Sequence, residues 1–139
     1  MVAQRIAYEG RLRCRAEHGP SGASLITDAP KDNAGEGASF SPTDLLVTAL
    51  ATCMATTMGI AARRAGFELG AVELDAEKHM HPQPPRRIAR AVIAMRIHGS
   101  YTPEQRALLE AAAHGCPVAR SVHPDLVQDV RFTWVGESS

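Results

Sequence analysis

Three cysteines have the most reactive side chains in this sequence: Cys14, Cys53 and Cys116. Only the thiolate form of a cysteine is a strong nucleophile. Cys53 lies within "ALATCMATT", a run of small and apolar residues that is typical of a buried helix. There the sulfur is either a small packing group or a nucleophile. The second reading requires a nearby cation or hydrogen-bond donor, because apolar burial alone raises the pKa of a thiol.

Cys116 has a different setting, because it follows Gly115 and precedes Pro117. This order is typical of a residue that caps a short helix whose first position is proline. A sulfur at the cap faces free backbone N–H groups, which favour the thiolate. Cys116 could form a disulfide with Cys53 if the fold brings them together. We expect Cys14 to be a packing residue on the apolar face of a strand.

Alternating polar and apolar residues over 5–17 predict one half-buried strand, and residues 23–29 predict a second. Residues 30–40 are rich in glycine and polar side chains and predict a loop. The sequence "SPTD" then opens a long helix. Ser41 is a suitable cap residue, and Pro42 is suited to the first helical position. Asp44 is suited to be the acidic residue that completes the cap in the first turn. Gly66 suits its end.

The long helix has no charge from 45 to 62, which just reaches the length of a membrane span. Four threonines and few large apolar residues favour a soluble helix that is buried nearly all round. Helical spacing places Cys53 mid-helix on a buried face, together with Leu46, Leu50, Thr57 and Ile60.

The second half of the chain predicts strands at 71–78, 88–98 and 127–135. A capping pattern at Thr102 starts another helix, which runs to His114. The order β-β-α-β-β-α-(α)-β is that of a single α+β domain over residues 1–139. A helix buried on all sides is hard to cover in so short a chain. We therefore expect an intimate homodimer in which these helices pack together.

Composition excludes several functions. Lys+Arg and Asp+Glu number 15 each, and aromatic residues make up 4%, so neither charge nor stacking favours a nucleic-acid partner. The first residues lack the apolar region of a secretory signal, which predicts a cytoplasmic protein without structural disulfides. His79 and His81 lie on one strand without a third ligand of matching pattern, so we predict no metal.

Two segments together resemble the OsmC/Ohr family, that is, osmotically inducible protein C and the organic hydroperoxide resistance proteins. These are "FSPTDLLVTALATCMATTMGIAARRAGFEL" and "HGCPVARSV". In this family a proline precedes a first helical cysteine by about eleven residues, as Pro42 precedes Cys53. A second cysteine follows in a "CP" dipeptide about sixty residues later, as Cys116-Pro117 does here. The resemblance covers essentially the whole chain.

The resemblance implies an α+β fold with antiparallel sheets, a long central helix and an intertwined homodimer with sites at the subunit interface. It implies a thiol peroxidase in which Cys53 attacks an organic hydroperoxide and becomes a sulfenic acid. Cys116 would then form a disulfide with it. An external dithiol, typically dihydrolipoyl groups, would reduce that disulfide, with no bound cofactor. An apolar hydroperoxide suits the buried setting better than hydrogen peroxide.

The sequence departs from the Ohr pattern where an ion pair is expected to hold the thiolate. Thr43 stands where the pattern has glutamate, and Asp44, nine residues before Cys53, lies close to half a turn around the helix from that sulfur. The pattern also has an arginine in the first β-turn region, where "EHGPSG" offers His18 and Arg15 lies close by. The chain therefore resembles a divergent OsmC-like branch. The alternative is a redox-silent protein that binds a hydrophobic small molecule in the dimer cleft, or a stress protein without a ligand.

Overall fold

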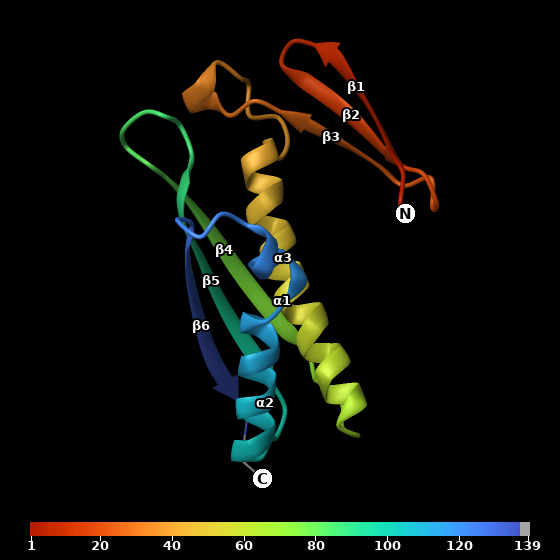
Figure 1. The fold of residues 1–139 in the computed structure, drawn as a ribbon, viewed down its shortest axis with the longest axis vertical. Helices are drawn as coiled ribbons and strands as arrows, with labels where there is room; N and C mark the ends of the chain where they lie inside the picture. The colour runs from red at the N-terminus through yellow and green to blue at the C-terminus, as the bar shows by residue number, and fades with distance from the viewer. Residues whose placement is uncertain (137–139) are drawn as a thin grey trace. The chain divides into compact units, whose positions relative to one another are not determined.

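The computed structural model describes residues 1–136 and divides into two compact units, Met1–Leu46 and Val47–Ser139. Figure 1 shows the elements in chain order. The elements are β1 (Gln4–Gly10), β2 (Arg13–His18), β3 (Ser24–Asp28), the short 3-10 helix η1 (Lys31–Asn33), α1 (Pro42–Arg64), β4 (Val72–Met80), β5 (Ile88–His98), α2 (Pro103–His114), α3 (Pro117–Ser121) and β6 (Val127–Val135). The fold is mixed α+β, as predicted.

The first unit contains an antiparallel sheet in the order β1-β2-β3. The prediction of one strand over 5–17 is wrong, because the chain reverses at Arg11 and Leu12 (φ 56° and 62°). Both lie in the left-handed region that a tight hairpin turn requires. The register shifts by one residue between Tyr8 and Gly10, and this bulge beside the two-residue turn places Tyr8 opposite Cys14. The period of two therefore continues through the turn and hides it.

The apolar face of this sheet is open to solvent in the single chain. Ile6 on β1 is 61% exposed and Tyr8 is 66% exposed, and Leu25 on β3 is also exposed. The expected half-burial of this region is therefore wrong for the chain by itself. The register places Ile6, Ala16 and Leu25 side by side across the three strands. The sheet thus presents a continuous apolar surface.

The segment between β3 and α1 is fixed by a buried carboxylate. Asp28 is 1% exposed, and its Oδ2 accepts a hydrogen bond from the Ala38 N–H at 2.9 Å. That hydrogen bond, together with the positive charge of Arg13, lowers the pKa of Asp28. Arg13 also donates to Glu36 Oε2 at 2.6 Å. These contacts hold residues 36–38 against the end of β3.

The second unit contains a sheet in the order β4-β5-β6. β4 runs antiparallel to β5, whereas β6 runs parallel to it. The prediction of purely antiparallel sheets is therefore wrong for this pair. α2 and α3 lie between β5 and β6 in the chain, and a helical crossover of this kind joins parallel strands. The bounds of β5 and β6 coincide with the predicted 88–98 and 127–135.

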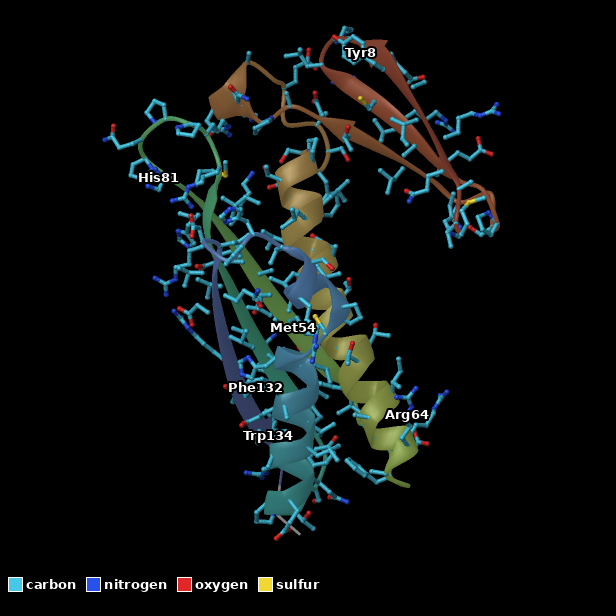
Figure 2. All side chains as sticks on the ribbon, viewed as in Figure 1. Tyr8, Met54, Arg64, His81, Phe132 and Trp134 are labelled. Carbon is cyan, nitrogen blue, oxygen red and sulfur yellow. The ribbon has the colours of Figure 1, made fainter. Side chains whose placement is uncertain are left out.

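The core lies between this sheet and the helices that cover one of its faces (Figure 1). The inward side chains of β5 are fully buried, as predicted: Ala91, Ile93, Met95 and Ile97. In Figure 2, Met54 lies on α1, and Phe132 and Trp134 lie on β6. Met54 belongs to the buried cluster, and the two aromatic residues pack against it.

The prediction that α1 is buried nearly all round is wrong for the single chain. Its buried residues form one face: Val47, Leu50, Ala51, Met54, Met58 and Ala62. Leu46 and Ile60, which we expected to be buried, are exposed. By length and composition alone, α1 is the one helix among the described residues that could cross a membrane, and a core helix meets the same criteria. Its one buried face packs on the sheet.

Candidate functional site

Cys53 lies in the middle of α1 and belongs to the second unit. It is partly buried and packs against the core cluster, next to the buried face that Met54 belongs to. Its Sγ lies 3.9 Å from Thr57 Oγ1, one helical turn further on. Ala49, one helical turn before Cys53, is exposed, and so is Thr52, the residue just before it. The sulfur therefore lies at the boundary between core and solvent.

Cys116 is the cap of α3, as predicted. Its backbone is extended (φ −65°, ψ 152°), and Pro117 occupies the first helical position. The Ala119 N–H donates a hydrogen bond to Cys116 Sγ at 3.3 Å. The side chain is fully buried, with 0% exposure. The neighbouring Arg120 donates from Nε to the Gly115 carbonyl at 3.0 Å, which fixes the chain just before the cap.

The fold of the second unit brings these two cysteines together. The pKa of the Cys116 thiol is raised, first because burial removes it from water, and also because the Cys53 thiol is its hydrogen-bond and charge neighbour. The Ala119 N–H opposes this shift by favouring the thiolate. Both cysteines are free thiols. Cys53 and Cys116 are therefore neighbouring free thiols within the second unit.

Thr43 and Asp44 both belong to the start of α1. Asp44 Oδ2 accepts from the Ser41 N–H at 2.9 Å, and Ser41 Oγ accepts from the Asp44 N–H at 3.1 Å. Thr43 Oγ1 lies 3.1 Å from Ser41 Oγ. This reciprocal pair is the capping box that the sequence predicts. Asp44 thus has a structural role that accounts for its presence.

His18 and Arg15 lie away from the first β-turn. His18 ends β2, with its Nδ1 2.6 Å from Ser21 Oγ in the following turn. Arg15 donates to Ser24 Oγ at 3.3 Å across to β3. The arginine of the first turn is instead Arg11, whose Nη2 lies 3.1 Å from Glu36 Oε1.

The turn at Arg11 is the feature that sequence reasoning missed. The signal that could have found it is the isolated Gly10 inside an otherwise regular strand pattern, because such a glycine marks a turn or a bulge. Gly10 has a positive φ of 86°, and the register between β1 and β2 shifts beside it.

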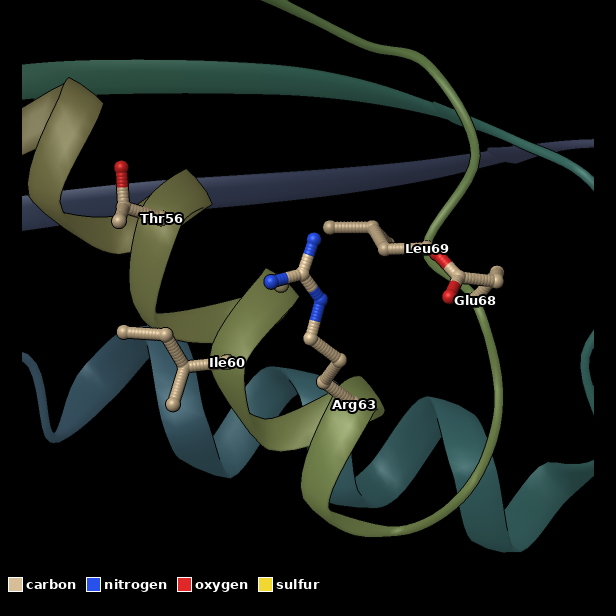
Figure 3. Close-up of a pocket in the computed structure, with 6 residues that line it drawn as sticks. Thr56, Ile60, Arg63, Glu68 and Leu69 are labelled. Carbon is tan, nitrogen blue, oxygen red and sulfur yellow. The ribbon is translucent and has the colours of Figure 1, made fainter.

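A pocket of about 290 Å³ lies on α1 beyond Cys53 (Figure 3). The residues that line it are Thr56, Gly59, Ile60, Arg63, Glu68 and Leu69. Thr56 lies almost one helical turn after Cys53, so the pocket begins close to that cysteine along the helix. Its wall is apolar at Ile60 and Leu69, and Arg63 adds a positive charge.

Within residues 1–136, no group of three or more histidine, cysteine, aspartate or glutamate side chains is placed to hold a metal ion. His79 lies 3.0 Å from Glu77 Oε2, and His81 hydrogen-bonds to the Gln83 carbonyl at 2.9 Å. The two histidines thus have separate partners.

Residues 35–130 match the family model described as OsmC-like protein. This stretch contains the helix with Cys53 and the cap with Cys116. The chain belongs to the OsmC-like protein family. A comparison with curated proteins finds no match.

Solved structures of OsmC-like proteins share this fold. A proposed osmotic stress induced and detoxification response protein from Psychrobacter arcticus 273-4 has 39% sequence identity and a TM-score of 0.89, covering 96% of each chain. An organic hydroperoxide resistance protein OsmC from Legionella pneumophila has 19% identity and a TM-score of 0.72 over 96% of each chain. An OsmC like protein from Mycoplasma pneumoniae has 15% identity and a TM-score of 0.80 over 98% of each chain.

Proposed function

We propose that this OsmC-like protein is a cysteine-based peroxidase that reduces organic hydroperoxides. The observation that supports this most directly is the pairing of a half-exposed thiol, Cys53, with a buried thiol, Cys116, in one unit. A peroxidase of this kind needs one sulfur that substrate can reach and a second that can close a disulfide with it. Solved OsmC-like structures named as organic hydroperoxide resistance proteins agree with this choice.

The proposed reaction has two steps on the protein. The Cys53 thiolate attacks the distal oxygen of the hydroperoxide, the O–O bond breaks, and the alkoxide takes a proton and leaves as an alcohol. Cys53 is left as a sulfenic acid. The sulfur of Cys116 then attacks the Cys53 sulfur, and the hydroxyl leaves as water after taking a proton. An external dithiol, such as a dihydrolipoyl group, returns two electrons and restores both thiols.

We infer from the resemblance that Arg11, the arginine of the first β-turn, contributes to the peroxidase reaction. Glu36 supports this assignment, because its carboxylate pairs with Arg11 while Thr43 occupies the usual glutamate position. Arg13, which binds the other oxygen of Glu36, orients that carboxylate. Arg11→Ala is expected to slow oxidation of Cys53, and Arg15→Ala is the matched control that removes one charge from the same sheet. Equal rates in the two variants would contradict the assignment.

We also propose that the protein is a cytoplasmic homodimer. The exposed apolar face formed by Ile6, Tyr8 and Leu25, and the exposed Ile60 of α1, favour a second copy as the partner. Sedimentation equilibrium should give twice the mass of the 14.9 kDa chain. Ile6→Glu should shift it toward the monomer, and an unchanged monomeric mass for the parent protein would contradict the proposal.

The experiment that tests the peroxidase uses the Cys14→Ser protein, so that only the two site thiols remain. One equivalent of cumene hydroperoxide is expected to remove both free thiols, with one alcohol formed for each pair. Cys53→Ser should abolish both changes. Loss of thiols without alcohol formation, or equal loss in the Cys53→Ser variant, would count against the peroxidase.

The alternative function is a redox-silent protein that binds a hydrophobic small molecule. The pocket with Ile60, Arg63 and Leu69 is the observation that favours it. In that case the hydroperoxide leaves both thiols free, and Cys53 reacts slowly with alkylating reagents. The same thiol count therefore separates the two functions.

A further inference from the structure

We propose that the reducing dithiol opens the Cys53–Cys116 disulfide only at Cys53, so that Cys116 is always the sulfur that leaves. This inference rests on the proposed function, because it concerns the disulfide which that function requires. It names the sulfur that receives the reductant and the group that stabilises the departing one.

The first argument is access. In thiol–disulfide exchange the attacking thiolate forms a bond to one sulfur while the other departs, and the choice of sulfur depends on which one the thiolate can reach. Cys116 is fully buried in the core cluster, together with Leu109 and Ala113. An attack on Cys116 would have to come through that packed core. Cys53 is half-buried, and its helix neighbours Ala49, Thr52 and Thr56 are exposed.

The second argument concerns the leaving sulfur. As the reductant attacks Cys53, negative charge develops on Cys116 Sγ. The Ala119 N–H already points at this sulfur from 3.3 Å and favours its thiolate. Burial raises the pKa of Cys116, which by itself makes this sulfur a poorer leaving group, so access to Cys53 decides which sulfur is attacked. Once it has left, the Cys116 thiolate takes up a proton from the second thiol of the reductant or from water.

The remaining chemistry follows from the first step. Cys53 now carries the mixed disulfide, and the reductant's second thiolate attacks the reductant's own sulfur in that bond. The reductant closes its own disulfide, and Cys53 leaves as a thiolate. Two electrons have passed from the dithiol to the protein. Cys53 is thereby returned in the charged form that attacks the next hydroperoxide.

The test uses the Cys14→Ser protein and forms the disulfide with stoichiometric diamide, so it does not depend on peroxidase activity. The oxidised protein is exposed briefly to glutathione, and free thiols are capped with N-ethylmaleimide. Peptide mass mapping should place glutathione on Cys53 and maleimide on Cys116, in at least roughly tenfold excess over the reverse pattern. Glutathione on Cys116, or an even mixture, would overturn the inference. So would failure of diamide to form the disulfide.

Single-cysteine proteins give a matched control. Cys14→Ser/Cys116→Ser and Cys14→Ser/Cys53→Ser are treated with Ellman's reagent, which reacts by the same exchange chemistry. Native Cys53 should react at least about ten times faster than native Cys116, and the difference should vanish in concentrated guanidinium chloride. Comparable native rates would contradict the access argument. If hydroperoxide fails to form the disulfide, but the disulfide formed with diamide opens at Cys53, the result contradicts the peroxidase function and supports this inference.

Discussion

Oxidation of Cys53 and Cys116 should stabilise the folded protein by about 3 kcal/mol. The two residues are 63 positions apart, and a cross-link of that span restricts the unfolded chain by about 4 kcal/mol in the loop-entropy model. Measured disulfide stabilisation is typically about 2–4 kcal/mol, because strain in the native state offsets part of the loop-entropy gain. We therefore expect a stabilisation of about 3 kcal/mol.

Urea unfolding of the Cys14→Ser protein, in its reduced and diamide-oxidised forms at one protein concentration, measures this quantity. With a denaturant slope of about 1–3 kcal/mol/M, the midpoint should rise by roughly 1–3 M on oxidation. The Cys14→Ser/Cys53→Ser variant should not respond to the oxidant. An oxidised form that is no more stable than the reduced one would show that the bond strains the fold. The reasoning that these sulfurs meet without rearrangement would then be refuted.

Three further predictions concern a helix cap, a buried tyrosine and a paired carboxylate. Asp44→Ala should lower the free energy of unfolding by about 1 kcal/mol through loss of the capping box, and it should leave the alkylation rate of Cys53 unchanged. A slower rate would instead give Asp44 a part in the chemistry. Tyr101 is buried, donates to the His98 carbonyl at 2.6 Å and accepts from the Gly70 N–H at 2.8 Å. Tyr101→Phe should therefore cost about 2 kcal/mol in urea unfolding, and a negligible loss would contradict this. The pKa of Asp129 is lowered to about 2 by Arg131 and Arg90. Because the folded pKa lies below the unfolded value of about 4, its stabilisation is present above pH 4 and lost as the pH falls toward 2. Asp129→Asn should flatten acid unfolding in that window, and an unchanged profile would contradict the assignment.

The second unit could be predicted well because its local signals agree with its packing. The inward residues of β5 recur at every second position, and Ala91, Ile93, Met95 and Ile97 are all fully buried. α2 begins at a capping box formed by Thr102 and Gln105, both visible in the sequence. The cap at Cys116 was equally visible, since proline at the first helical position fixes the backbone before it. Where capping residues and prolines mark the start of a helix, the sequence alone is sufficient to predict that start.

The direction of β6 could not be predicted from its own residues. Val130, Phe132 and Trp134 share a face whichever way the strand runs, so the pattern says nothing about its partner. The register Met95 with Phe132 and Ile97 with Trp134 depends on the crossover through α2 and α3. The hairpin at Arg11 could not be predicted for a related reason, because the register shift beside Gly10 restores the alternation that a two-residue turn would invert. In both cases the direction of the strand is set by the segment that connects it to its neighbour, and the strand's own residues do not reveal it.

The face of α1 was ambiguous for a reason that bears on the chemistry. Alanine and threonine occur all around this helix, so composition does not distinguish the side toward the sheet from the side toward solvent. Only packing decides that Met54 is fully buried while its neighbour Cys53 is half-exposed. The proposed peroxidase reaction needs this intermediate position, because a fully buried Cys53 could not be reached by substrate and a fully exposed one would not lie beside Cys116. The small residues that made the face of this helix hard to predict, Ala49, Thr52 and Thr56, are exposed beside Cys53.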